Sequence, residues 1–245
     1  MAYHIMRTVI VIIWVVLATI LCSSVAIVLS LFEEGDNLSH SAARLWAKSI
    51  LLVSGVKVKT EGLSNINEHT SCIYMANHQS MFDILALFGY LPVQFRWLAK
   101  KELFHIPLFG HAMARVGYIS IDRSNRRSAH KSLLEAARKI AGGVSVVIFP
   151  EGSRSQDGKL KPFQPGGFHL AMLSGRPIVP IIICGTHDVM PKGNLHITPG
   201  DVVVSIKPAI EITDYGKKDK KNIMDKVHST MEQDIARIKA NWAPL

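Results

Sequence analysis

The sequence predicts one α/β domain built on a single mixed sheet flanked by helices, with a two-helix membrane segment before it. Two observations lead to this fold class. From Val56 onward, short apolar stretches typical of strands alternate with helical patterns. Residues 9–32 contain no charged side chain and are long enough to cross about 30 Å of hydrocarbon at ~1.5 Å per residue. We therefore expect a membrane segment at residues 1–55 and one α/β domain at residues 56–245.

The first helix of the membrane segment is expected at residues 9–32. This run is longer than the apolar region of a typical signal peptide, and no small-x-small cleavage site precedes a polar start. After the charged break at residues 33–37, Ser39 can cap a second helix that reaches Val53, in which apolar residues alternate with Arg44 and Lys48. The second helix suits the headgroup level of a membrane, although a helix packed on the domain would show much the same pattern.

The domain is expected to contain seven strands and five further helices. Strands are expected at residues 56–59, 72–76, 93–99, 117–121, 144–149, 178–184 and 202–206, and helices at residues 80–88, 106–114, 129–141, 167–173 and 221–240. No internal repeat or low-complexity linker interrupts this alternation. It therefore predicts one domain, of a size that can carry an active site.

Composition narrows the choice of partners. Lysine and arginine exceed aspartate and glutamate by 28 − 19 = +9, which predicts anionic partners. Only 7% of the residues are aromatic and no nucleic-acid motif is present, so an anionic membrane and phosphate compounds are favoured over nucleic acid. The three cysteines are far apart and the 11 histidines show no metal-ligand spacing. Neither a disulfide framework nor a bound metal is expected.

The stretch from Cys72 to Asp83 is the strongest candidate for chemistry. His78 can take up and return a proton near neutral pH, and the Asp83 carboxylate can orient it. Five residues of continuous helix would set the two side chains about 140° apart, so they meet only if His78 precedes the helix and Asp83 lies in its first turn. Ser80 and Asp83 form a capping-box pattern that supports this arrangement. The same pattern allows the alternative that Asp83 is only a helix cap and His78 only a turn residue.

Two further stretches deliver charged side chains at the ends of predicted strands. Residues 117–123 end in Arg123, and residues 149–155 carry Glu151 and Arg154 just after an apolar strand. In open α/β sheets, ligands bind at the carboxyl ends of strands. Arginine at that edge suits phosphate, because its planar guanidinium offers paired charged hydrogen bonds.

Together these stretches resemble the glycerolipid acyltransferase family, over roughly residues 56–206. Asn77, His78 and Asp83 match its N-H-x4-D block, and residues 117–123 match its second block. Residues 149–155 match the F-P-E-G-T-R block, with Ser153 in place of threonine. Residues 179–181, which include Pro180, match the fourth block.

The resemblance implies a role for each matched residue. His78 would be the general base and Asp83 its orienting partner. The phosphate of the acceptor would be held by Arg123, Glu151, Gly152, Ser153, Arg154 and Lys161. The chain departs from the family pattern at Gln164 and Pro165, where other members often carry basic residues, and this leaves Lys161 as the expected remaining cation.

The implied reaction moves a fatty acyl group from an acyl carrier protein or coenzyme A thioester to the 2-hydroxyl of 1-acylglycerol 3-phosphate (lysophosphatidate), giving phosphatidate. No cofactor beyond this thioester co-substrate is expected. Since no G-x-S-x-G nucleophile elbow is present, we expect direct attack by the hydroxyl, with backbone amides at the Ser80 helix start as candidate oxyanion donors. Two alternatives stay open: an acyltransferase for another lysolipid, and a catalytically silent membrane protein that binds anionic lipid.

The resemblance also implies a location. Thioester donors of this kind are cytoplasmic, and unpaired cysteines and a basic domain suit the anionic inner leaflet. We therefore expect the bacterial inner membrane, with the domain on the cytoplasmic face. Either a helical hairpin that enters and leaves one leaflet or a spanning helix with its N-terminus outside would satisfy this, and the amphipathic second helix favours the hairpin. A spanning helix oriented by Arg7 and by Glu33 and Glu34 under the positive-inside rule would instead put the domain outside.

Overall fold

The computed structural model describes residues 2–32, 37–122, 125–215 and 219–242. Within these ranges seven strands form one sheet in the order β1-β7-β6-β2-β5-β3-β4. The strands are β1 (Val56–Glu61), β2 (Ile73–Ala76), β3 (Arg96–Lys100), β4 (Ile119–Ile121), β5 (Val146–Ile148), β6 (Ile178–Cys184) and β7 (Gly200–Ile206). Only the β6–β7 pair is antiparallel among these neighbours. The predicted single mixed sheet is confirmed.

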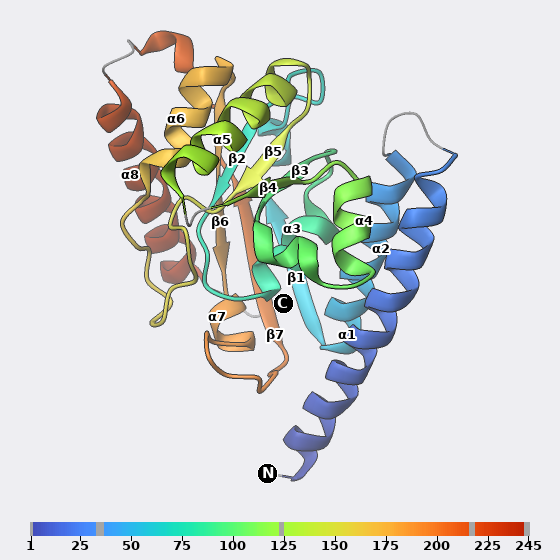
Figure 1. Ribbon diagram of the computed structural model, residues 1–245. Helices are drawn as coiled ribbons and strands as arrows, with labels where there is room; N and C mark the ends of the chain where they lie inside the picture. Colours follow the sequence, from blue (N-terminus) through green and yellow to red (C-terminus); the bar gives the residue numbers. More distant parts are fainter. Residues whose placement is uncertain (1, 33–36, 123–124, 216–218, 243–245) are drawn as a thin grey trace.

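Helices cover both faces of the sheet (Figure 1). They are α1 (Ala2–Leu29), α2 (Asn37–Val53), α3 (Phe82–Tyr90), α4 (Phe109–Arg115), α5 (Arg126–Ala141), α6 (Pro165–Ser174), α7 (Thr186–Val189) and α8 (Lys220–Ala240), with short 3₁₀ turns at residues 63–65, 101–105 and 212–214. The helices α5, α6 and α8 pack on one face, and α2 and α3 pack on the other. The two faces therefore have separate hydrophobic cores.

The central strands are apolar throughout because helices cover both of their sides. Every residue of β6 is buried, and so is every residue of β2. Outside the sheet, α5 is amphipathic and begins where the Asn125 side chain accepts a hydrogen bond from the Arg127 amide at 2.8 Å. These local rules explain why the strand and helix predictions fall on the observed elements.

Several boundaries differ from the predictions, each for a local reason. The helix expected from residue 106 begins at Phe109, because Ile106 is extended before Pro107. The helix expected from residue 167 begins at Pro165, whose fixed φ suits the first helical position. The four-residue α7 was not predicted, since it is too short for a periodic pattern.

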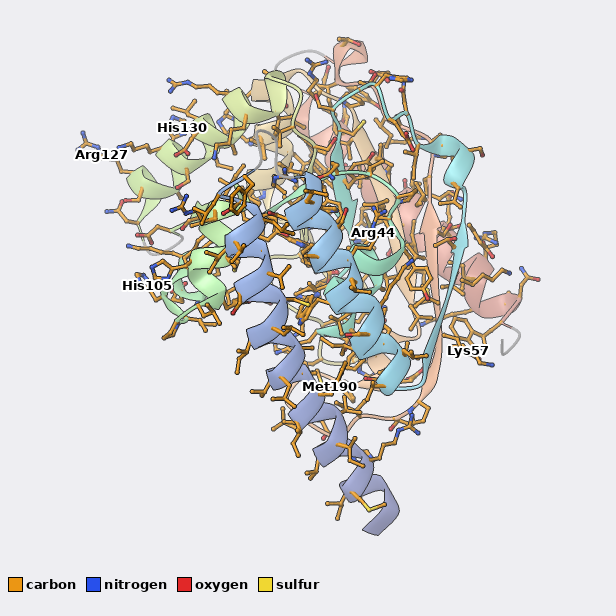
Figure 2. The ribbon with its side chains drawn as sticks, turned by 90° about the vertical axis from the view of Figure 1, so that its right-hand side faces the viewer. Arg44, Lys57, His105, Arg127, His130 and Met190 are labelled. Carbon is orange, nitrogen blue, oxygen red and sulfur yellow. The ribbon has the colours of Figure 1, made fainter. Side chains whose placement is uncertain are left out.

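The first two helices lie side by side and antiparallel (Figure 2). Hydrogen bonds join them near both ends: the Arg7 guanidinium donates to the Ser54 carbonyl at 2.7 Å, and the Ser39 hydroxyl donates to the Ala26 carbonyl at 3.2 Å. Residues 5–29 form the one helix, among the described residues, long and apolar enough to cross a membrane. In the apolar window of 18 residues within this helix, 22% is buried in the protein, whereas the core helix of a soluble protein is mostly buried.

Candidate active site

Asn77 fixes the end of β2 beside β6. Its side-chain amide donates to the Ile183 carbonyl at 2.9 Å, and its side-chain oxygen accepts from the Ile183 amide at 2.7 Å. The side chain thus continues the pairing of the two strands past the point where β2 stops. The next residue, His78, leaves the sheet in a defined direction.

His78 and Asp83 are in direct contact. The distance from His78 Nδ1 to Asp83 Oδ2 is 2.8 Å, with His78 in the turn before α3 and Asp83 in its first turn. Asp83 Oδ2 also accepts the backbone N–H groups of Gln79 at 2.6 Å and Ser80 at 2.8 Å, and Asp83 Oδ1 accepts the Thr186 hydroxyl. An acceptor surrounded by donors requires the proton of the neutral imidazole on Nδ1. His78 Nε2 is then left to accept a proton.

Asp83 therefore caps α3 and orients His78 at the same time. The Ser80 amide donates to Asp83 as in a capping box, and the Phe82 amide donates to the Ser80 hydroxyl at 3.2 Å. Of the candidate oxyanion donors at the start of this helix, the amides of Gln79 and Ser80 already donate to Asp83.

An aromatic stack holds the imidazole from its side. The rings of His78 and Phe149 are parallel within 9° and their centroids lie 3.8 Å apart. Trp97 packs on Phe149 in turn, at 5.3 Å between centroids. With Asp83 bonded at the ring edge and Phe149 against its face, the His78 ring has one orientation.

Glu151 links two loops from beneath the site. Its Oε1 accepts the His78 amide at 2.6 Å and its Oε2 accepts the Lys161 amide at 3.0 Å, and the residue is buried. Burial raises the pKa of Glu151 to about 7, although the two amide hydrogen bonds lower it. A carboxylate whose two oxygens already accept hydrogen bonds has no donor for a phosphate anion. These contacts favour a positioning role, and the implied phosphate contact of Glu151 stays a prediction.

The other predicted phosphate-site residues divide into three groups. Gly152, Ser153 and Arg154 line the same cavity as His78. Lys161 bonds to Ser153, with 2.6 Å between its Nζ and the serine hydroxyl oxygen. Arg123 lies outside the described residues. Pro180 is a buried residue of β6, paired with Met75 of β2, so it belongs to the sheet.

A cavity of about 390 Å³ extends from His78 into the space between α1, α2 and α4. Its lining includes the cations Lys100, Arg154 and Lys192, and it includes apolar residues such as Ala26 of α1 and Ala112 of α4. The loop that carries Arg154 lies beside the base, since the Ser155 amide donates to the His78 carbonyl at 2.8 Å. The Lys192 Nζ donates to the Arg154 carbonyl at 3.2 Å, which holds the two residues together. A general base thus lies at the polar end of a long apolar cavity.

Sequence reasoning missed four residues of this arrangement: Phe149, Thr186, Lys100 and Lys192. Thr186 follows the end of β6, the strand beside β2, so the strand-end rule used for Arg123 and Arg154 could have found it. Lys100 is the last residue of β3, so the same strand-end rule could have found it. Lys192 comes from a loop without a pattern of its own.

The chain belongs to the acyltransferase family, whose model matches residues 57–184. It is 33% identical over 185 residues to the 1-acyl-sn-glycerol-3-phosphate acyltransferase of Escherichia coli, covering 75% of each chain. It is 39% identical over 181 residues to the chloroplastic 1-acyl-sn-glycerol-3-phosphate acyltransferase BAT2 of Brassica napus, covering 73% of this chain but 51% of the relative. The chain thus spans about half the length of that plant relative.

A solved structure has the same fold from end to end. The crystal structure of the 1-acyl-sn-glycerophosphate acyltransferase PlsC from Thermotoga maritima superposes with a TM-score of 0.86. The match covers 99% of this chain and 98% of that one, at 24% sequence identity. The N-terminal helices are therefore part of the shared architecture.

Proposed function

We propose that this protein transfers a fatty acyl group from a thioester to the 2-hydroxyl of 1-acylglycerol 3-phosphate, giving phosphatidate. The observation that carries the proposal is the His78–Asp83 pair, 2.8 Å apart at the polar end of an apolar cavity. The names of the bacterial and plant relatives support the same activity. The thioester is a substrate, and the proposed reaction requires no cofactor or metal.

Catalysis proceeds by direct attack. His78 Nε2 takes the proton of the acceptor hydroxyl while the hydroxyl oxygen forms a bond to the thioester carbonyl carbon. The carbon–sulfur bond then breaks, and His78 returns the proton to the departing thiolate. Asp83 stabilises the imidazolium between these two transfers, and its bonds to Gln79 and Ser80 keep it in place.

Cations at the mouth of the cavity suit the phosphate of the acceptor. Arg154 and Lys192 are adjacent, and Lys100 lines the same cavity. Lys161, bonded to Ser153, is the fourth described cation near this mouth. We propose that these residues, with Arg123, hold the phosphate by charge-assisted hydrogen bonds.

The apolar end of the cavity suits the acyl chain, and the outer face of α1 suits lipid. Exposed apolar side chains of that face include Ile10, Ile13, Leu17, Ile20, Leu21 and Val28. We propose that α1 and α2 dock as a hairpin in one leaflet of the bacterial inner membrane, with the domain on the cytoplasmic face. The contacts of α1 with α2 near both ends favour a helix held along the domain over one that leaves it to span.

An assay of purified protein in detergent tests the activity. Lysophosphatidate, lysophosphatidylcholine and lysophosphatidylglycerol are each offered with acyl carrier protein and coenzyme A thioesters. We expect transfer to lysophosphatidate to exceed transfer to the other two acceptors. A preference for another lysolipid would reject lysophosphatidate as the acceptor. Absence of transfer to every acceptor would favour a catalytically silent lipid-binding protein.

A further inference from the structure

A second cavity, of about 230 Å³, lies against the other face of the sheet. Ala129 and Leu133 of α5 form one wall, and Gly166 and Gly167 of α6 form another. Ile148 of β5 forms its floor and belongs to the hydrophobic core under α5 and α6. In Figure 1 these two helices lie across the sheet from α1 and α2. The second cavity therefore faces away from the proposed membrane side.

The two cavities meet beside the base. Both are lined by Leu98, Phe149 and Gly152, and Phe149 is the ring stacked on His78. Gly152 has a positive φ of 74° and places no side chain between the two cavities. A ligand whose reacting carbon lies at His78 can thus extend into both cavities.

We propose that the second cavity holds the pantetheine arm of the thioester donor, while the acyl chain of the donor fills the first. This inference rests on the proposed function. A thioester has two arms that leave its reacting carbon in different directions, which matches two cavities that meet at the base. The acceptor is a lipid and approaches from the α1 side, whereas the donor comes from water.

The walls of the second cavity suit this arm. Pantetheine combines amide groups with an apolar dimethyl centre. Ala129, Leu133 and Ile148 provide apolar contact, and the Gln164 side chain provides an amide partner. Among the described residues that line this cavity, none is cationic.

The charge of α5 suits the phosphate at the end of the arm. Residues 126–141 contain five lysines and arginines against one acidic residue, Glu135, and Glu135 pairs with Lys139 at 3.6 Å. Arg127, His130 and Lys131 are exposed, and Figure 2 shows Arg127 and His130 at the outer edge of the molecule. The positive charge of this helix suits either coenzyme A or an acidic carrier protein, both of which carry the pantetheine arm.

Filling the second cavity tests the inference. A Cβ atom added at Gly166 meets no atom within 4 Å, so Gly166→Leu projects into the cavity without a clash at Cβ. We expect kcat/KM with both the coenzyme A thioester and the carrier-protein thioester to fall by at least about tenfold. A short N-acetylcysteamine thioester lacks most of the arm, so its kcat/KM and the KM of the lysolipid should change by less than about twofold. Wild-type kcat/KM for the two natural donors distinguishes the sources of the arm.

Two further variants control this experiment. Gly142→Leu makes the same exchange just after α5, at a residue that lines neither cavity. The φ of Gly142 is −77°, and a Cβ added there meets only helix carbonyl oxygens, at 3.4 Å. Its kcat/KM for each donor and its KM for the lysolipid should match those of the wild-type protein. Ala129→Leu fills the cavity from the opposite wall and should reproduce the donor effect, so it carries the test if Gly166→Leu fails to fold by thermal melting.

Four results would overturn the inference. A raised KM for the lysolipid with unchanged donor preference would assign the cavity to the acceptor. An equal loss with long and short thioesters, or a loss with only one of the two natural donors, would exclude a shared arm. If wild type acylates a different lysolipid, only the proposed substrate fails, and the donor comparison is made with that acceptor. Absence of transfer to every lysolipid would reject the proposed function and this inference together.

Discussion

At the residue scale, Asp83 organises the site because its donors come from separate parts of the chain. Gln79 and Ser80 belong to the turn before α3, and Thr186 belongs to the loop after β6. The carboxylate is fully buried, so these bonds replace its hydration. A capping role and a catalytic role are therefore compatible in the same side chain.

Asp83→Asn separates the two roles. The amide keeps one acceptor oxygen but places donor hydrogens where His78 or the backbone amides also donate. We expect kcat to fall about 10²- to 10⁴-fold, as is typical when a general base loses its arrangement, and His78→Ala to abolish transfer. The measurement is turnover per folded molecule, with folding followed by circular dichroism. Normal turnover with a lower melting temperature would leave Asp83 only its capping role.

Glu151 predicts a pH dependence of stability. Its pKa rises from 4.5 to about 7 on folding because of burial. The folded protein therefore keeps a proton that the unfolded chain releases, and this contribution to stability is lost as pH rises through that interval. Glu151→Gln removes the titration, so the melting temperature of the variant should fall less than that of wild type between about pH 5 and about pH 8. Parallel curves for the two proteins would contradict the assignment.

The contact between His78 and Asp83 could be predicted from sequence because the two residues are close together along the chain. His78 and Asp83 are five residues apart, so helix geometry alone indicated which arrangement lets them meet. The contact of Asp83 with Thr186 spans 103 positions, and the stack of Phe149 on His78 depends on the order of β2 and β5 in the sheet. Such contacts follow from strand order, which a local pattern does not specify.

At the scale of the elements, α1 and α4 close the deep end of the first cavity. Ala26 and Ala112, one from each helix, are buried there and pack in the same small cluster with Val116. Their methyl groups leave room that a larger side chain would fill. Under the proposed function, we therefore expect the length of acyl chain that fits to depend on how closely these two helices approach.

Ala26→Phe tests this limit. We expect the preferred donor to become shorter, because the ring occupies the far end of the cavity, while the KM of the acceptor is unchanged. The measurement is kcat/KM over a series of thioesters of increasing chain length. Val16→Phe adds similar bulk on the exposed side of α1 and should keep the wild-type profile. An unchanged profile in Ala26→Phe would mean that the chain lies elsewhere.

The elements themselves were predictable because their patterns are strong. The apolar run at residues 178–184 has the same bounds as β6. The amphipathic pattern from Lys221 to Ala240 covers all of α8 except its first residue, Lys220. The expected strand at residues 93–99 was shifted, since β3 begins only at Arg96. Arg96 pairs with β5 through its backbone while its buried side chain bonds the Phe95 carbonyl at 3.0 Å, a use of arginine that hydropathy does not predict.

At the scale of the whole molecule, apolar and basic surfaces lie on different sides. The apolar face of α1 suits lipid, and the basic face of α5 suits a soluble anionic donor. The sheet separates them, and Phe149, which stacks on His78, lines both cavities. Under the proposed function, a lipid substrate and a water-soluble substrate would reach one base from different directions.

Charge on the lipid-facing side should release the protein from membranes. Ile13 and Leu17 are 54% and 55% exposed, so glutamate at both positions should not disturb the core. We expect Ile13→Glu with Leu17→Glu to lose sedimentation with anionic vesicles but to keep turnover on substrate in detergent micelles. Leu173→Glu, at a 41% exposed position of α6, is the control and should sediment normally. Retained sedimentation of the double variant would exclude α1 as the docking face.

The contact between Thr8 and the loop after α7 also constrains the order of biosynthesis. The Ile197 amide donates to the Thr8 hydroxyl at 3.3 Å across 189 positions of sequence, and β1 pairs with β7, which starts at Gly200. The ribosome makes α1 before β1 and β7, so the surface that receives the buried side of α1 is complete only after much more of the chain has emerged. During that interval lipid or a chaperone must cover the helix, because a long apolar segment left in water aggregates. Membrane targeting of this protein is thus expected to begin before its domain folds, with the bilayer serving as the first partner of α1 and the domain as the second.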